Sequence, residues 1–436
     1  MDMEEKIGYK QILRQKEYMK TIIAALINRF GDSIDGIALI WLVYQLTQSA
    51  AWSALIFGVN RIPTIFLQPF AGAAIEGKNK KQIMIVTDVI RGLCVGFIAT
   101  AFVFGFLNQW WLLGATIIIS CAEAFRGPAS SALIPKLLDK KYYAFGLSLN
   151  SSACNVMELI GLGAAGVIIS LFSVSTAIYI DMITFFLSAL IILTLRVKEE
   201  NLVKGRINAK EYMSSLKGGF SYLKENSLLR YFVLLAVFLN AVLVPLNSLQ
   251  APLISEVLKV NEIMLSVLGF AITTGMIAGA ASYPYLSNKL NKRGIASFSA
   301  YSIGVYYLIF VIVGRFITSK PLIYILISIS SFIVGTAVAL LSTFCNVEFV
   351  KNIQVEYIAR VSSIFSASCV AAIPVVSFLV SVLAGFTPTV VLFLIAGIID
   401  IIVSTMLIRK KRFAAMDLEE TEDILSGEEV ADSTAC

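Results

Sequence analysis

Twelve long apolar segments constrain the fold of this chain more than any other feature of its sequence. Each is long enough to cross the hydrocarbon core of a bilayer, for which a helix needs about 20 residues. Strands of a membrane barrel would alternate apolar and polar residues, and these segments do not. The sequence therefore predicts an all-α membrane protein with twelve transmembrane helices, at residues 21–45, 52–75, 82–105, 110–134, 148–171, 174–195, 229–255, 263–287, 296–317, 321–346, 361–384 and 387–408.

The composition of the 436-residue chain agrees with this class. It is 58% hydrophobic and 15% charged, whereas soluble domains have about 25% charged residues. The six cysteines form no CxxC pair and histidine is absent, so we expect neither a disulfide framework nor a metal site. We also expect no cofactor, no enzymatic activity and no nucleic-acid partner. No Walker-type phosphate loop is present, so ATP does not drive the protein directly.

Basic residues predict how the chain crosses the membrane. Of the 35 lysines and arginines, 28 lie in the N-terminal segment, the even-numbered connections and the C-terminal segment, with the longest connection counted through Arg230. Because cytoplasmic loops are enriched in these residues, both termini should be cytoplasmic in a multi-pass protein of the cell membrane. The first twenty residues are polar and lack the features of a cleavable signal peptide. A monomer is expected.

The longest connection divides the chain into two pseudo-symmetric halves of six helices each, at residues 21–195 and 229–408. This linker, residues 196–228, should be cytoplasmic and includes a segment that resembles a short amphipathic surface helix. Residues 1–20 form a cytoplasmic N-terminal segment. Residues 409–436 are acidic, which is typical of a disordered tail.

The first predicted span carries charges that a simple membrane anchor would not need. Arg29, Asp32 and Asp35 lie near its middle, where each charge costs roughly 2.5–3.5 kcal/mol on insertion scales. Asn28, Asp32 and Asp35 share one helical face, and Arg29 precedes Asp32 by three residues, within pairing distance. Two interpretations stay open: a buried ion pair that sets helix register, or a transport site that faces a polar cavity.

Charged residues within the other spans are concentrated in the first half of the chain. The second half has only Asp400 clearly within a span, whereas the first half adds Arg61, Asp88, Arg91, Glu123, Arg126, Glu158 and Asp181. This asymmetry indicates that one half carries the ionisable machinery and that the other half forms an apolar wall.

Helical spacing predicts local ion pairs in two of these spans. Asp88 and Arg91 are three residues apart, as are Glu123 and Arg126, and such neighbours face each other on a helix. Asp35, Glu158 and Asp181 have no local basic partner. They could exchange protons or serve as protonated packing residues, and we favour packing for Asp181.

Six residues are therefore candidates for substrate or proton binding. Because histidine is absent, proton exchange near neutral pH must depend on carboxyl groups. The candidates are Asp32, Asp35, Arg29, Glu123, Arg126 and Glu158.

Several segments resemble one known family over nearly the whole chain. Residues 72–81 read GAAIEGKNKK, with a glycine, an acid four residues later and paired bases, similar to the loop signature of the major facilitator superfamily. Glu76 stands where aspartate is usual, Gly77 stands where a base is usual, and Leu162 stands where the antiporter signature has proline. The branch that includes macrolide-efflux proteins and the enterobactin exporter has segments similar to residues 31–32 with 41–47, 88–91, 126–129 with 133–135, 180–185 and 354–361.

The resemblance implies the major facilitator fold and proton-coupled export of amphipathic compounds by alternating access. It also implies a cytoplasmic gate, in which Glu76 approaches the start of the eleventh span when the inner side closes. The predicted gate residues are Gly72, Glu76, Lys80, Lys81, Asp88, Arg91 and Arg360.

The sequence thus predicts a secondary transporter, a multidrug efflux antiporter that exports hydrophobic or cationic small molecules in exchange for protons. Four acids against three arginines slightly favour neutral or cationic substrates. One alternative is an exporter of a defined metabolite such as a siderophore or peptide product, for which Arg29, Arg61 and Arg126 would favour an anionic ligand. A second is a non-transporting scaffold or sensor, which would not need the buried charges.

Overall fold

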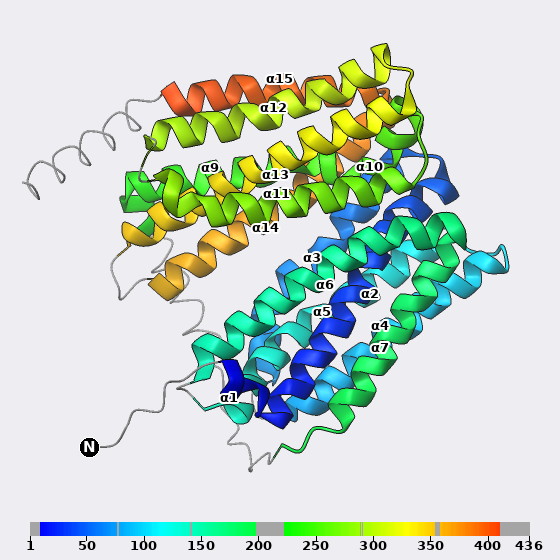
Figure 1. The fold of residues 1–436 in the computed structure, drawn as a ribbon, viewed down its shortest axis with the longest axis vertical. Coiled ribbons are helices and arrows are strands. Elements are labelled where there is room, and N and C mark those ends of the chain that lie inside the picture. Colours follow the sequence, from blue (N-terminus) through cyan, green and yellow to red (C-terminus); the bar gives the residue numbers. More distant parts are fainter. Residues whose placement is uncertain are drawn as a thin grey trace, which may run out of the picture. The chain divides into compact units, whose positions relative to one another are not determined.

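Long helices make up almost all of the described part of the chain (Figure 1). The computed structural model describes residues 9–75, 78–139, 142–197, 222–287, 289, 291–353 and 358–409, and no strand occurs among them. The predicted all-α fold is confirmed. After the short α1 (Tyr9–Leu13), the twelve long helices are α2 (Lys16–Thr47), α3 (Ala50–Ile75), α4 (Lys80–Val103), α5 (Gln109–Leu137), α6 (Tyr143–Leu171), α7 (Val174–Leu193), α9 (Ser227–Ser248), α11 (Ile263–Ser287), α12 (Lys292–Phe316), α13 (Lys320–Lys351), α14 (Ile358–Ala384) and α15 (Thr389–Arg409).

Eleven of these helices are long and apolar enough to cross a membrane, counted over the described residues. The exception is α2, which contains Arg29, Asp32 and Asp35. Its length is not the reason, because its 32 residues extend about 48 Å at 1.5 Å per residue. The charges set α2 apart from the other long helices, as its sequence predicts.

The chain forms two compact units that differ from the predicted halves by short segments, namely unit 1 (Met1–Met213, Asn247–Phe270 and Ile373–Thr387) and unit 2 (Ser214–Leu246, Ala271–Ala372 and Pro388–Cys436). The halves 21–195 and 229–408 therefore stay a prediction. Residues 198–221 of the linker and residues 410–436 of the tail lie outside the described residues.

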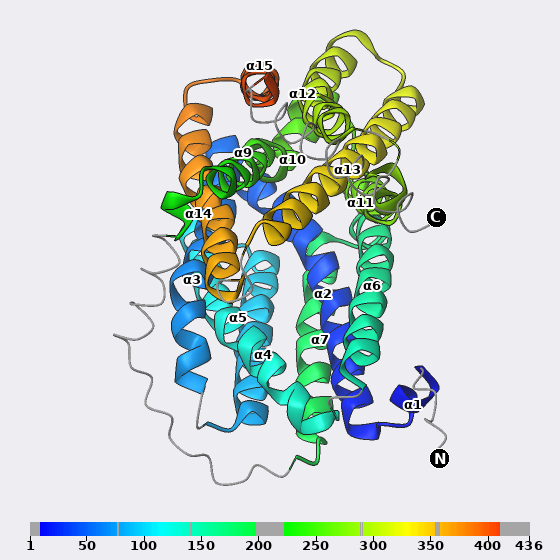
Figure 2. The ribbon, with the colours of Figure 1, turned by 90° about the vertical axis from the view of Figure 1, so that its left-hand side faces the viewer.

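In unit 1, α2 packs against α6 and α7, while α4 packs against α5 and α7 (Figure 2). Gly31 permits the close approach of α2 and α7. A Cβ atom at this position would lie 2.0 Å from Oγ1 of Thr184 and 2.3 Å from Oδ1 of Asp181. Small residues let membrane helices approach in this way, so Gly31 places α2 directly against the polar side chains of α7.

One end of α2 is tied to the end of α7 by polar contacts. Nζ of Lys20 donates to the carboxylate of Glu17 at 2.8 Å and to the backbone oxygen of Thr194 at 3.0 Å. The backbone N–H of Arg196 donates to Glu17 at 2.8 Å. Hydrogen bonding, first of all from Lys20, holds the pKa of Glu17 below its usual value. Exposed pairs of this kind contribute at most about 1 kcal/mol, so they align the helix ends more than they stabilise the unit.

In unit 2, α12 packs against α13 and α15, and α11 and α13 meet at two glycines. A Cβ atom on Gly275 would lie 2.2 Å from the backbone oxygen of Phe332, and one on Gly335 would lie 2.2 Å from that of Ile272. Since neither backbone can be displaced cheaply, this crossing requires glycine on both helices.

The predicted span 229–255 is divided in the structure. It consists of α9, the short α10 (Gln250–Pro252) and the π-helix η2 (Leu253–Leu258). Within α9, the hydroxyl of Tyr307 donates to the backbone oxygen of Val242 at 2.5 Å and accepts from the N–H of Leu246 at 3.1 Å. A side chain that enters the helical hydrogen-bond ladder and a nearby proline, here Pro245, are both known causes of helix distortion.

Candidate functional site

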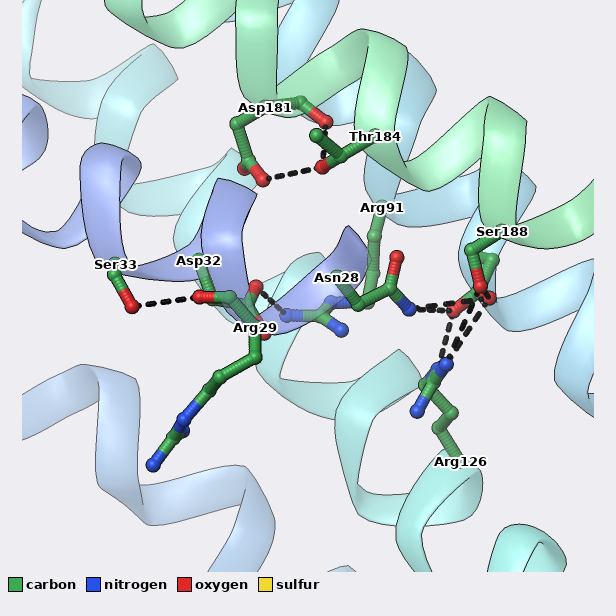
Figure 3. Close-up of polar contacts among 10 residues, drawn as sticks. Asn28, Arg29, Asp32, Ser33, Arg91, Arg126, Asp181, Thr184 and Ser188 are labelled. Atoms are coloured by element: carbon green, nitrogen blue, oxygen red, sulfur yellow. Dashed lines mark hydrogen bonds and ion pairs between the residues drawn. The ribbon is translucent and has the colours of Figure 1, made fainter. Parts of the chain in front are cut away.

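Asp88 is the centre of a buried polar cluster in unit 1, and its partners Asn28, Arg126 and Ser188 are labelled in Figure 3. The cluster joins four helices, because Asp88 lies on α4 and its partners lie on α2, α5 and α7. Asn28 donates to both carboxylate oxygens at 3.4 Å, and Ser188 donates to Oδ2 at 2.8 Å. Arg126 forms an ion pair with Oδ1 through Nε and donates to Oδ2 through Nη2 at 3.3 Å. Asp88 is 0% exposed, so this network compensates the burial of its charge.

A second ion pair lies close by, between α4 and α2. Nη2 of Arg91 contacts Oδ1 of Asp32 at 2.8 Å, and the side chain of Asp32 is 33% exposed. The guanidinium of Arg91 also lies 4.2 Å from the ring centre of Phe185, a favourable cation–π contact. Its Nε is buried without a hydrogen-bond partner among the described residues. Arg91 is thus held by its contact with Phe185, while the Asp32 side of the ion pair is accessible.

Asp35 is the buried acid with the fewest partners in this region. It is 9% exposed, and its Oδ1 has no hydrogen-bond partner among the described residues. Asp32, Arg91 and Asp181 are its charged neighbours. Asp181, by contrast, accepts a hydrogen bond from Thr184 at 3.1 Å and lies against Gly31. An unpaired carboxyl group next to an ion pair can bind and release a proton without breaking a hydrogen-bonded network.

The remaining predicted site residues lie at more accessible positions. Nη2 of Arg29 on α2 contacts Oε2 of Glu158 on α6 at 2.6 Å, with both side chains partly exposed. Arg29 points away from Arg91 and Arg126 (Figure 3). Glu123 is exposed and forms no ion pair with a described residue, although it interacts electrostatically with Arg91.

The predicted local ion pairs are wrong. Each arginine instead pairs with a carboxylate on another helix, in the pairs Arg29–Glu158, Arg91–Asp32 and Arg126–Asp88. The short aspartate side chains stay close to their own helices, while arginine is long enough to cross the gap of 8–10 Å between helix axes. Sequence spacing reports only neighbours on the same helix, and nothing in the pattern identifies Ser188 as a partner of Asp88.

The structure describes some of the predicted gate residues and not others. Nζ of Lys81 donates to the backbone oxygen of Leu195 at 2.9 Å, and Lys80 is buried. Gly72 lies in α3. Glu76 lies outside the described residues. Since Glu76 is central to the predicted gate, the gate itself stays a prediction.

Three other predicted gate residues are located on their helices. Asp88 and Arg91 belong to the polar clusters described above rather than pairing with each other. The backbone of Arg360 lies in the first turn of α14.

Unit 1 also contains a cavity of about 240 Å³ between α2, α3, α5 and the end of α9. Its wall has an apolar part and a polar part. The apolar side chains are Leu39, Ile40, Val43, Ile56, Phe57 and Leu112, and the polar ones are Ser53, Asn60, Arg61, Thr116, Asn247 and Ser248. No acid lines this cavity among the described residues, which distinguishes it from the clusters around Asp88 and Asp32.

Among the described residues, eleven helices are long and apolar enough to cross a membrane, and ion pairs connect helices within unit 1. A family model described as "Transmembrane secretion effector" matches residues 11–432. The chain therefore belongs to this family of major facilitator transporters, as its motifs predict.

Curated relatives and solved structures agree with this assignment. The multidrug efflux pump Tap of Mycobacterium tuberculosis (strain ATCC 25618 / H37Rv) is 22% identical over 321 residues, covering 72% of this chain and 75% of Tap. The MFS-type transporter YvqJ of Bacillus subtilis (strain 168) is 22% identical over 284 residues, covering 64% of this chain and 67% of YvqJ.

The fold matches those of crystallised transporters. A crystal structure of the nucleoside transporter NupG has a TM-score of 0.72 at 13% identity and covers 90% of this chain and 98% of its own. A bacterial homologue of the iron transporter ferroportin in an inward-facing state has a TM-score of 0.69 at 14% identity, covering 91% and 99%. At these identities the likeness establishes the major facilitator fold alone.

Proposed function

We propose that this protein exports hydrophobic or cationic small molecules across the cell membrane in exchange for protons, by alternating access. The observation that carries the proposal is Asp35, a buried carboxyl group without a hydrogen-bond partner at Oδ1 among the described residues, next to the Asp32–Arg91 ion pair. Ionisable groups inside transmembrane helices are costly and mark proton or substrate pathways. The multidrug efflux pump Tap is a relative consistent with this activity.

The charge arrangement supports a proton site and a substrate surface in the same unit. Protonation of Asp35 removes a negative charge beside Arg91, which changes the balance of charges around the Asp32–Arg91 pair. A conformational equilibrium can shift only if the two states bind the proton differently. Asp32 is partly exposed, so its pair with Arg91 can differ between the two states. Exposed Glu123 offers an acid to a cationic substrate.

Substrate-dependent proton release tests this function directly. We expect purified protein in weakly buffered solution to release protons when the hydrophobic cation tetraphenylphosphonium is added, because cation binding and protonation compete for the same acids. A pH indicator measures the release, with the same addition to protein-free detergent as control. If the cation binds and no protons are released, the proposed coupling through these acids is wrong. If the protein binds no compound from a panel of hydrophobic cations and drugs, the protein would be a scaffold or sensor.

The proposed orientation has both termini and the linker 196–228 in the cytoplasm. It depends on the distribution of 28 of the 35 basic residues and on the positive-inside rule. A cysteine introduced at Gly205, in a background where native cysteines are replaced, should resist a membrane-impermeant maleimide in intact cells and react after permeabilisation. Efficient labelling of intact cells would reverse the orientation.

A further inference from the structure

The cavity of unit 1 contains an arginine that no acid neutralises among the described residues. Of the three arginines that could favour an anionic ligand, Arg29 and Arg126 are engaged by Glu158 and Asp88. Arg61 has no ion pair or hydrogen bond with any described residue, and its side chain lines the cavity. Within the described part of the chain, the charge on the cavity wall is therefore positive.

Ser248 supplies a second, independent indication of a ligand. It is 3% exposed, it lines the same cavity, and its Oγ has no hydrogen-bond partner among the described residues. A buried hydroxyl without a partner is unfavourable, so such groups usually have a role. Rotation of this side chain toward the cavity would let a ligand provide the missing partner.

Other lining residues add further hydrogen-bond donors to the cavity. The amides of Asn60 and Asn247 line it and are not engaged by other described residues. Guanidinium, amide and hydroxyl groups together suit the oxygens of a carboxylate or phosphate. The apolar side chains of the lining come from α2, α3 and α5.

The size of the cavity limits what it can hold. Its volume of about 240 Å³ lies just below the range of about 300–1,000 Å³ typical for drug-sized ligands. It suits a small amphipath, or the head and first carbons of a larger one.

We infer that this cavity binds the head group of an amphipathic organic anion, with Arg61 as the charge partner and Ser248 as a hydrogen-bonding partner. This site is separate from the acids of the proposed function and adds an anionic class to the substrates. The anion can be a free organic acid or an anionic lipid, since both present the same chemistry to Arg61.

Three eight-carbon ligands that differ in head-group charge test the inference. We expect radiolabelled octanoate to bind the full-length protein in phosphatidylcholine nanodiscs, and octanol or octylammonium to compete at least about tenfold less well, the scale of a charge-assisted contact. Replacing part of the lipid by phosphatidylglycerol distinguishes the two sources of the anion. Competition by this lipid identifies a lipid site, and its absence identifies a site for free acids.

Variants assign the binding to this cavity. Arg61→Gln should weaken octanoate binding about tenfold and Arg61→Lys less, because lysine keeps the charge. Ser248→Ala should weaken binding about threefold without lowering the thermal midpoint, since its hydroxyl has no partner to lose among the described residues. Arg315→Gln, which removes an exposed arginine at the end of α12 in unit 2, is the matched control.

The outcomes separate this site from the proposed transport function. Equal binding of octanoate and octanol, or equal loss in Arg61→Gln and Arg315→Gln, would overturn the inference. Binding is measured without a proton gradient, so it is independent of coupling. Conversely, proton release on addition of tetraphenylphosphonium should be unchanged in Arg61→Gln.

Discussion

Asp35→Asn is expected to abolish export driven by a pH gradient while the protein still binds hydrophobic ligands. Asparagine has nearly the same volume but cannot bind and release a proton. The buried group beside Asp32 and Arg91 can therefore no longer couple proton movement to transport. Apolar contacts supply much of the affinity in such cavities, so we expect ligand binding to remain. Uptake of tetraphenylphosphonium into inverted vesicles after an imposed pH gradient measures the rate, which should fall to that of vesicles without the protein.

Two further variants make this result specific. Asp139→Asn has the same chemical change at an exposed position after α5 and should transport normally. Asp32→Asn should also lose coupling, because it leaves Arg91 without the carboxylate that it contacts at 2.8 Å. Full transport by both Asp35→Asn and Asp32→Asn would move the proton site elsewhere, with Glu123 and Glu158 as the next candidates.

Asp88→Asn should reduce the stability of unit 1 more than any other single change proposed for this protein. Asp88 is fully buried and binds side chains from three other helices. Removing one partner of a buried ion pair costs about 3–5 kcal/mol, because the other charge stays buried without compensation. The measurement is the thermal midpoint of purified protein, followed by size-exclusion chromatography after heating.

The double variant Asp88→Asn/Arg126→Gln distinguishes this cause from a general loss of packing. If the uncompensated guanidinium is responsible, removing it should recover part of the lost stability. Glu17→Gln is the control, since it breaks a partly exposed pair with Lys20 and should cost at most about 1 kcal/mol. An unchanged midpoint in Asp88→Asn would show that the cluster around Asp88 does not stabilise the unit.

Helix positions were predictable because the bilayer imposes a length and a composition on every span. The predicted span 21–45 corresponds to α2 (Lys16–Thr47), and the predicted span 174–195 corresponds to α7 (Val174–Leu193). The division of 229–255 was not predictable, because the hydroxyl that interrupts α9 comes from Tyr307, far away in the sequence.

The polar face of α2 was predictable and its partners were not. Helical periodicity alone puts Asn28, Asp32 and Asp35 on one face, and the cost of burying charge requires that this face meet other polar groups. Which groups it meets depends on how the helices pack. The structure joins Asp32 to Arg91 and Asn28 to Asp88, across distances that sequence spacing does not encode.

The same distinction applies to the cavity of unit 1. Sequence alone determines that Arg61 is a charged residue within an apolar span, and hence that something must offset its cost. Only the tertiary structure decides that Arg29 and Arg126 are neutralised by carboxylates on other helices. It also decides that Arg61 lines a cavity without acids among the described residues. The same cavity is lined by Ser248, whose hydroxyl has no hydrogen-bond partner among the described residues. The reason is physical: periodicity and hydropathy are properties of single helices, whereas charge compensation is a property of helix pairs.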